Sequence, residues 1–190
     1  MIERAEELWD NARCTLQPGG WRKHPTAHVD SSCIVFPGAF IGPFVTIGRH
    51  CVVGPGAVIG SPGFGYTTTD EGHVYREHVQ GVQLADDVHV GANTCIDQGR
   101  HRPTRIGKGT RIDNLVHIAH NVEVGERCLI IAHSMIAGSV VIGDDVTVSP
   151  GALIRDHRDI GDGAHVGQGA NVVRPVEPGT VVAGNPARPL

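Results

Sequence analysis

A histidine at position 120 carries the clearest signal for chemistry in this sequence. It lies in the segment Ile118-Ala119-His120-Asn121. Ile118 belongs to a regular series of aliphatic residues that should point inward, so the side chain two residues later should lie on the surface. A neutral imidazole has a pKa near neutral pH and can take a proton from an amine or a hydroxyl. His120 is therefore the first candidate for a general base.

A glycine and a polar column should lie beside this histidine. If the chain stacks with a period of about 18 residues, His120 faces Gly138 on the next coil, about 4.8 Å away. Asn121 then faces Ser139, which in turn faces His157. The Gly138 amide could donate a hydrogen bond to an oxyanion formed next to the base. A base with a neighbouring amide donor suits acyl transfer.

A repeat of six residues supplies the elements that would position this site. An aliphatic residue returns at every sixth position through Val29, Val35, Ile41, Ile47, Val53 and Ile59, again at Leu84, Val90 and Ile96, and without a break from Ile106 to Val172. A period of six fits neither a helix nor a simple alternating strand, and it is typical of a parallel β-helix built from hexapeptides. Glycine often follows the aliphatic residue, where a Cβ would obstruct the backbone. The expected fold class is all-β, a parallel β-helix.

Breaks in the repeat define the expected domain organisation. Residues 28–186 should form the β-helix, with loop insertions at about 60–83 and 99–103. Residues 1–27 should cap it, with a short amphipathic helix indicated by Ile2, Ala5, Leu8 and Ala12. Residues 187–190 form a C-terminal tail. Loops that leave a rigid prism often carry binding groups, although the long loop could instead pack on a neighbouring subunit.

Composition agrees with one elongated domain and excludes some classes of function. Only 4% of residues are aromatic and the net charge is −4, so nothing indicates binding to nucleic acid or to a membrane surface. No apolar run approaches the length of a membrane span, and no signal peptide is indicated, so a cytoplasmic protein is expected. Cys33, Cys51 and Cys128 fall on inward positions and should be buried thiols. The cysteine spacings indicate neither a metal site nor a disulfide.

Six further motifs occur along the chain: Ser61-Pro62-Gly63-Phe64-Gly65-Tyr66, Val90-Gly91-Ala92-Asn93-Thr94-Cys95-Ile96-Asp97-Gln98-Gly99, Ile112-Asp113-Asn114, Ile118-Ala119-His120-Asn121, Ile136-Ala137-Gly138-Ser139 and Val173-Arg174-Pro175. These motifs resemble those of a known enzyme family, the UDP-3-O-(3-hydroxyacyl)glucosamine N-acyltransferases of lipid A synthesis, which are hexapeptide-repeat acyltransferases. They follow the family's order with matching gaps, from about Val29 to Pro186.

The resemblance implies a left-handed β-helix that forms a homotrimer with active sites in the grooves between subunits. It implies that His120 is the general base for an amino-sugar amine attacking an acyl thioester. Asp113 would orient or charge-balance His120, and the Gly138 amide would be the oxyanion donor. The implied substrate-binding residues are Asn114, Asn121, His157, Arg174, Phe64 and Tyr66, with Arg174 suited to a phosphate. No metal and no tightly bound cofactor are implied.

Departures from the family leave the substrates open. Family members carry a uridine-binding domain before the solenoid, whereas about 28 residues precede it here. Gln98 stands where the family usually has arginine, and no C-terminal helical extension for acyl carrier protein follows the solenoid. The ending Gly184-Asn185-Pro186-Ala187 resembles hexapeptide acetyltransferases that use coenzyme A. The co-substrate is therefore expected to be either an acyl-CoA or an acylated carrier protein, and the acceptor an amino sugar, with or without a nucleotide.

Two other classes of function remain open at this point. A trimeric solenoid can hold zinc through histidines at its interfaces, as the γ-class carbonic anhydrases do, and His117, His120 and His133 raise that possibility. The histidine pattern does not match that family well. A non-catalytic trimeric scaffold is the other alternative, because repeat solenoids can serve as assembly surfaces.

Overall fold

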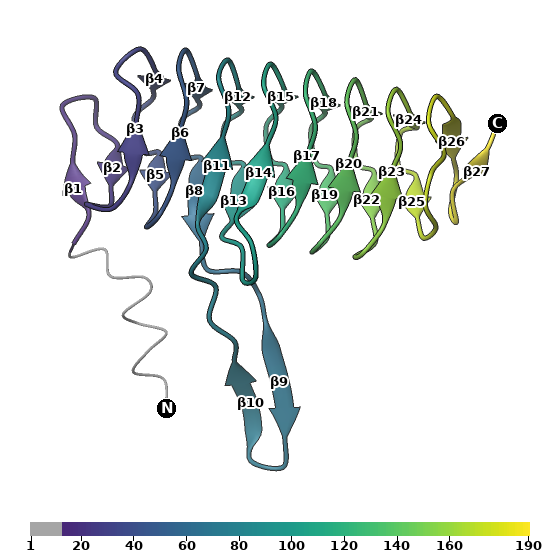
Figure 1. Ribbon diagram of the computed structural model, residues 1–190, viewed down its shortest axis with the longest axis horizontal. Helices are drawn as coiled ribbons and strands as arrows, with labels where there is room; N and C mark the ends of the chain where they lie inside the picture. The colour runs from purple at the N-terminus through teal and green to yellow at the C-terminus, as the bar shows by residue number, and fades with distance from the viewer. Residues whose placement is uncertain (1–12) are drawn as a thin grey trace.

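The structure, a computed structural model, describes residues 13–190, and strands are its regular elements throughout this range. The chain winds as a left-handed parallel β-helix whose coils stack along one long axis (Figure 1). The expected all-β fold class is confirmed. The N-terminal helix expected from Ile2, Ala5, Leu8 and Ala12 lies outside the described residues.

Three sheets form the faces of the prism, and most pairs within them are parallel. Sheet A contains β1 (Thr15–Leu16), β2 (Arg22–Lys23), β5 (Phe40–Ile41), β8 (Val58–Ser61), β13 (Cys95–Asp97), β16 (His117–Ile118), β19 (Met135–Ile136), β22 (Leu153–Ile154) and β25 (Asn171–Val172). Sheet B contains β3 (His28–Val29), β6 (Thr46–Ile47), β11 (Val82–Leu84), β14 (Thr104–Ile106), β17 (Glu123–Val124), β20 (Val141–Ile142) and β23 (Asp159–Ile160). Sheet C contains β4 (Ile34–Val35), β7 (Val52–Val53), β12 (His89–Val90), β15 (Arg111–Ile112), β18 (Leu129–Ile130), β21 (Thr147–Val148), β24 (His165–Val166), β26 (Val181–Ala183) and β27 (Arg188–Pro189).

The two ends of the prism carry the antiparallel pairs of these sheets. At the N-terminal end, β1 pairs antiparallel with β2, which then pairs parallel with β5, so that coil-to-coil pairing begins at Arg22. At the C-terminal end, β27 pairs antiparallel with β26. Each arrangement folds the chain back over the terminal coil.

The register follows the expected coil length. His117 pairs with Met135, an offset of 18 residues (135 minus 117). Cys95 pairs with His117, an offset of 22 (117 minus 95), because the residues from Gly99 to Pro103 bulge out of the coil. Inward and outward residues alternate along each strand: Ile136 is fully buried, whereas Met135 before it is 39% exposed.

Turns at the corners share one backbone conformation. In most coils the third residue after an inward aliphatic residue lies in the left-handed region, as in Asn121 (φ 59°), Ser139 (φ 62°) and His157 (φ 53°). The glycine that directly follows the aliphatic residue has a different task, because a Cβ on Gly107 would lie 2.4 Å from the carbonyl of Gly125 in the next coil. It allows the coils to approach closely.

Small inward residues fill the corners and satisfy carbonyl groups there. The thiols of Cys33, Cys51 and Cys128 donate to the carbonyls of Gly48, Ala85 and Gly143 over 2.9, 3.1 and 3.0 Å. Cys51 and Cys128 are buried as expected, whereas Cys33, which was also expected to be buried, is partly exposed because it lies near the N-terminal end of the prism. Burial raises the pKa of Cys51 to about 11, which keeps the thiol protonated as a donor.

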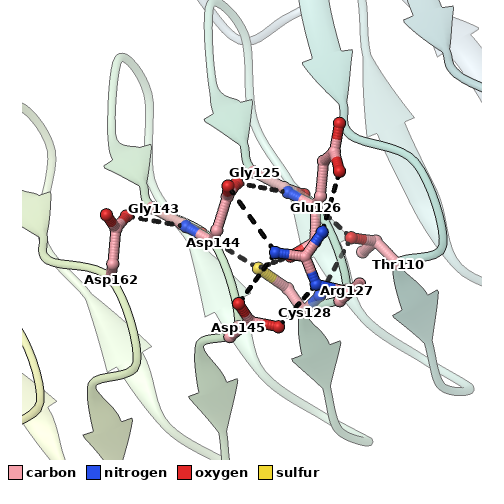
Figure 2. A network of polar contacts seen from close by, with 9 residues as sticks. All are labelled: Thr110, Gly125, Glu126, Arg127, Cys128, Gly143, Asp144, Asp145 and Asp162. Carbon is pink, nitrogen blue, oxygen red and sulfur yellow. Dashed lines mark hydrogen bonds and ion pairs between the residues drawn. The ribbon is translucent and has the colours of Figure 1, made fainter.

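Charged residues join neighbouring coils at the corner between sheets B and C (Figure 2). Asp144 accepts a hydrogen bond from the Glu126 N–H over 2.7 Å, and Asp162 accepts one from the Asp144 N–H over 2.9 Å. The Arg127 guanidinium donates to both carboxylate oxygens of Asp145. This network lies at a different corner from His120, and it links neighbouring coils.

A hairpin leaves the prism between β8 and β11. Its strands, β9 (Tyr66–Thr69) and β10 (Gly72–Tyr75), pair with each other and project from the side of the solenoid (Figure 1). The chain returns to the coil at Val82. The hairpin and the bulge at 99–103 flank the turn that carries His120.

Candidate active site

His120 lies where the chain turns from sheet A towards sheet B, two residues after the buried Ile118. Its ring packs directly on Gly138 of the next coil, because a Cβ at Gly138 would lie 2.6 Å from Cε1 and 2.9 Å from Nε2 of His120. Glycine leaves room for the imidazole at this position. The main chain joins the same two turns, since the Ser139 N–H donates to the His120 carbonyl over 2.9 Å.

Gly138 also offers a backbone donor. The N–H groups of Ala137 and Ser139 are bonded to the carbonyls of Ile154 and His120, whereas the Gly138 N–H has no backbone partner within residues 13–190. An unengaged N–H beside an imidazole is the kind of donor that can stabilise a developing oxyanion. The corner therefore combines a proton acceptor with an amide donor.

Asn121 connects the histidine to the bulge. Its Oδ1 accepts hydrogen bonds from the N–H groups of Arg100 and His101, over 2.7 and 3.1 Å. Its Nδ2 lies 2.9 Å from Nδ1 of His120 and 3.4 Å from Oγ of Ser139. One buried side chain thus holds the bulge, the imidazole and the next coil together.

His157 and Arg174 lie further along the same corner, and both are exposed. His157 follows Asn121 and Ser139 in the polar column, and its N–H donates to the Gly138 carbonyl over 3.1 Å. Arg174 comes two residues after a buried valine, as His120 comes two residues after Ile118. The corner therefore presents a histidine and an arginine to solvent beyond the His120–Gly138 pair.

Asp113 and Asn114 lie at the opposite edge of sheet A, where the chain arrives from sheet C. The Asp113 carboxylate accepts hydrogen bonds from the N–H groups of Asn114 and Ala132, over 2.7 and 3.2 Å. Asn114 Oδ1 accepts one from the Ala92 N–H over 2.6 Å. Within one chain the structure does not bring Asp113 beside His120, and both side chains hold coils together.

The long loop contributes a second histidine to the face of His120. His78 is 1% exposed, and its ring centroid lies 4.9 Å from that of His120. A Cβ at Gly63 would lie 2.7 Å from the His78 ring, and one at Gly65 would lie 2.6 Å from it. The two glycines of the Gly-Phe-Gly segment therefore make space for His78.

Aromatic side chains continue from His78 to the surface. Ring centroids are 5.9 Å apart for Tyr75 and His78, 5.4 Å for Tyr66 and Tyr75, and 5.1 Å for Phe64 and Tyr66. Phe64 is 85% exposed and Tyr66 is half exposed, so the row ends at solvent. The sequence pointed to Phe64 and Tyr66, and the structure joins them to His120 through Tyr75 and His78.

A buried carboxylate lies one coil before His120. Asp97 accepts a hydrogen bond from Oγ of Ser61 over 2.5 Å, and its Oδ2 lies 3.6 Å from Nε2 of His117. Burial raises the pKa of Asp97, against the opposing effects of Ser61 and His117. Gln98, beside it, donates to the Gly60 carbonyl over 2.9 Å and so anchors the start of the long loop.

The surroundings keep both site imidazoles neutral. Burial is the main cause that lowers the pKa of His120, and the nearby Arg100 and His157 lower it further. Burial also lowers the pKa of His78 to about 4, with His120 as the next cause. A neutral imidazole keeps the lone pair that a general base requires.

The histidines of the zinc alternative do not come together within one chain. Among residues 13–190 no group of three histidine, cysteine, aspartate or glutamate side chains is arranged to hold a metal ion. His133 lies at the corner between sheets C and A, away from the corner of His120. The same residues contain no helix that is long and apolar enough to span a membrane.

Sequence reasoning missed two parts of this site. It noted the long loop but gave no role to His78; a histidine following a Gly-Phe-Gly segment in an insertion was the available signal. It also predicted the position of the bulge at 99–103 but not its contact with Asn121. The bulge acts through the backbone N–H groups of Arg100 and His101, and backbone contacts leave no trace in residue type.

Comparisons with known proteins show similarity in both sequence and fold. The family model described as Bacterial transferase hexapeptide (six repeats) matches residues 26–61, 103–138 and 124–156. The UDP-3-O-acylglucosamine N-acyltransferase of Caulobacter sp. (strain K31) is 41% identical over 152 residues, which cover 80% of this chain and 44% of the relative. The corresponding protein of Campylobacter lari is 43% identical over 129 residues, covering 67% of this chain and 40% of that protein. The chain thus spans less than half the length of these relatives.

Solved structures share the fold. A UDP-N-acetylglucosamine acyltransferase from Bacteroides fragilis 9343 superposes with a TM-score of 0.74 at 18% identity, covering 87% of this chain and 72% of that one. The Arabidopsis UDP-N-acetylglucosamine acyltransferase gives a TM-score of 0.71 at 19% identity, with 93% and 73% covered. With its hexapeptide repeats and these relatives, the chain belongs to the hexapeptide-repeat acyltransferases, and over 80% of its length it is similar to part of a UDP-3-O-acylglucosamine N-acyltransferase.

Proposed function

We propose that this protein is an N-acyltransferase that moves an acyl group from a thioester to the amine of an amino sugar, with His120 as the general base. The observation that carries the proposal is the packing of the His120 ring on Gly138, whose N–H has no backbone partner in residues 13–190. The names of the relatives support the same reaction class.

The proposed reaction needs one base and one oxyanion donor. The amine nitrogen attacks the thioester carbonyl carbon, a C–N bond forms, and the carbonyl oxygen becomes an oxyanion that accepts a hydrogen bond from the Gly138 N–H. His120 takes a proton from the attacking nitrogen. The C–S bond then breaks, and the thiolate leaves with the proton that the imidazolium returns. No covalent enzyme intermediate is required.

Substrate binding is assigned to the groups around this corner. Arg174 and His157 are exposed and suit a phosphate of a nucleotide-linked sugar or of the donor. Phe64 and Tyr66 offer aromatic surface at the base of the hairpin. The donor is an acyl-CoA or an acylated carrier protein, used as a co-substrate in the cytoplasm, without a tightly bound cofactor.

A homotrimer completes the proposal. Asp113 and Asn114 lie at the edge of sheet A opposite to His120, so they can take part in the reaction only across a subunit boundary. The outer face of sheet A favours such a boundary, because its outward residues include Phe40, Val58, Met135 and Leu153, whereas those of sheet B include Thr46, Gln83, Arg105 and Glu123. Asp113 would then orient the partner subunit's histidine.

The test is a direct search for product. Purified protein is incubated with amino sugars and with UDP- and dTDP-linked amino sugars, using acetyl-CoA and 3-hydroxyacyl carrier protein in parallel, and N-acylated products are detected by mass spectrometry. We expect a product that disappears in His120→Ala and persists in His28→Ala, a control on the exposed face of sheet B. Full activity in His120→Ala, or trapping of an acyl-enzyme, would contradict the mechanism.

A further inference from the structure

Asn121 occupies a position that substrate cannot easily reach. Its side chain is buried, with 4% of the residue exposed. Both ends of its amide are engaged: Oδ1 by the bulge, and Nδ2 by His120 and Ser139. A side chain that is buried and fully hydrogen-bonded acts on its neighbours rather than on a ligand.

Contacts with the bulge fix the orientation of the Asn121 amide. The backbone N–H groups of Arg100 and His101 approach one end of it, over 2.7 and 3.1 Å, and they can only donate. The amide oxygen must therefore face the bulge, because the reverse orientation would place an NH2 group against two N–H groups. The NH2 end then necessarily faces His120.

The proton state of His120 follows from this orientation. Nδ2 of Asn121 lies 2.9 Å from Nδ1 of His120, and it is a donor. Nδ1 must therefore accept the hydrogen bond with its lone pair. A neutral imidazole that accepts at Nδ1 carries its proton on Nε2.

We propose that Asn121 is a positioning residue that holds the neutral His120 ring in the tautomer protonated on Nε2, and thereby controls when that ring can accept a proton. This deepens the proposed function and rests on it only for its kinetic consequence. Nε2 becomes a base only after its proton has left to water and another has arrived at Nδ1. An imidazolium would also place an Nδ1–H against the amide N–H of Asn121, so Asn121 opposes the charged form.

Other groups around the ring act in the same direction. Arg100 and His101 belong to the bulge, His157 lies along the corner and His117 lies on β16, the strand before His120. Each of them disfavours a positive charge on His120. His78 covers the ring from the loop. Asn121 differs from all of these because it contacts a ring nitrogen directly.

Asn121→Asp is the matched variant for the test. An aspartate of the same shape can still accept from the bulge with one oxygen, while the other accepts a hydrogen bond from Nδ1–H. We expect the variant to move the proton of neutral His120 from Nε2 to Nδ1. We also expect the acid limb of kcat/KM to move to higher pH by about one unit, because a contacting carboxylate favours the imidazolium. Ser139→Ala, which leaves the bulge contacts of Asn121 in place, should change neither.

The measurement is imidazole 15N NMR on the full chain labelled at histidine nitrogens, with His120 assigned by its loss in His120→Ala. The proposal predicts protonated Nε2 in the unmodified protein and protonated Nδ1 in Asn121→Asp. Protonated Nδ1 in the unmodified protein, or the same tautomer in both proteins, would overturn it. A purely structural role of Asn121 would leave the tautomer and the acid limb unchanged. Because the spectra need no substrate, failure of the proposed function would be recognised separately, by the absence of an N-acylated product with every substrate pair or by full activity of His120→Ala.

Discussion

His120 works in surroundings that disfavour its charged form. Burial, the largest cause, and then Arg100 and His157 lower its pKa below the ordinary value of 6.5. A general base is active when deprotonated, so activity should rise as pH increases through the lowered pKa and level off above it. We therefore expect the acid limb of kcat/KM to lie below pH 6.5, the ordinary value for histidine. A pH–rate profile from pH 4 to 8 measures this directly.

A loop variant tests the cause of that shift. His78 shields one face of the His120 ring, so His78→Ala should admit water and return the acid limb towards 6.5. His73→Ala, which changes a histidine on the exposed hairpin strand β10, should leave the limb in place. A limb that is unmoved in His78→Ala would show that the loop does not cause the desolvation.

At position 138 the site has no room for any side chain larger than the hydrogen of glycine. In Gly138→Ala the new Cβ would lie 2.6 Å from Cε1 of His120, so the imidazole must shift. Because a misplacement of about 1 Å can cost roughly 100-fold in rate, we expect kcat to fall by about that factor. The φ of Gly138 lies outside the left-handed region, so the backbone tolerates alanine and the melting temperature should change little. A variant with normal kcat would remove Gly138 from the site.

The sequence predicted contacts between stacked coils better than contacts made by the inserted loops. The spacing of about 18 residues placed Gly138 beside His120, because one repeated period determines which turns become neighbours. It could not place His78, since the path of an insertion does not follow that period. The resemblance assigned Asp113 to His120, and within one chain the two lie at opposite edges of sheet A.

At the scale of elements, the hairpin is separate from the stack. β9 and β10 pair with each other, and their exposed residues add nothing to the core of the prism. Replacing residues 67–74 with two glycines should therefore leave the melting temperature of the prism almost unchanged. The aromatic row loses its support next to Tyr66 and Tyr75, so we expect KM to rise several-fold while the acid limb of His120 stays in place. Thermal melting and steady-state kinetics measure both; a loss of folding would show that the hairpin supports the coil.

Regular elements follow from the sequence because every hexad repeats the same physical requirement. An inward aliphatic residue, a small or β-branched corner residue and a turn in the left-handed conformation recur in most of them. Glycine directly after the aliphatic residue was expected to permit backbone conformations that a Cβ would obstruct. In Gly107 it serves the close approach of the next coil instead, while the left-handed position is often occupied by other residues such as Asn121 and Ser139. Single-coil reasoning cannot reveal a contact that exists only after stacking.

At the scale of the whole molecule, the three faces of the prism differ. Sheet A presents Phe40, Val58, Met135 and Leu153 outward beside Arg22, His117 and Asn171, whereas sheet B presents mainly polar side chains. Large exposed apolar patches on soluble proteins commonly mark interfaces, and closed homo-oligomers are the usual result. His120 lies at one edge of sheet A and Asp113 at the other, so a trimer closed through this face would bring the two edges of neighbouring subunits together.

Leu153 and Val141 provide a matched pair for testing this assembly. Leu153 is 43% exposed on sheet A and Val141 is 37% exposed on sheet B, and both are outward residues of their strands. Since each side chain is similarly exposed in the single chain, replacement by aspartate should destabilise the prism little in either case. We expect light scattering to give three times the chain mass of 20.1 kDa for the unmodified protein and for Val141→Asp. In Leu153→Asp a charge would be buried at the proposed interface, so the measured mass should fall towards that of one chain. Activity should fall as well, because dissociation separates Asp113 of one subunit from His120 of its neighbour. A trimer that persists in Leu153→Asp but dissociates in Val141→Asp would move the interface to sheet B, and the Asp113 of one subunit would then have no route to the His120 of another across sheet A.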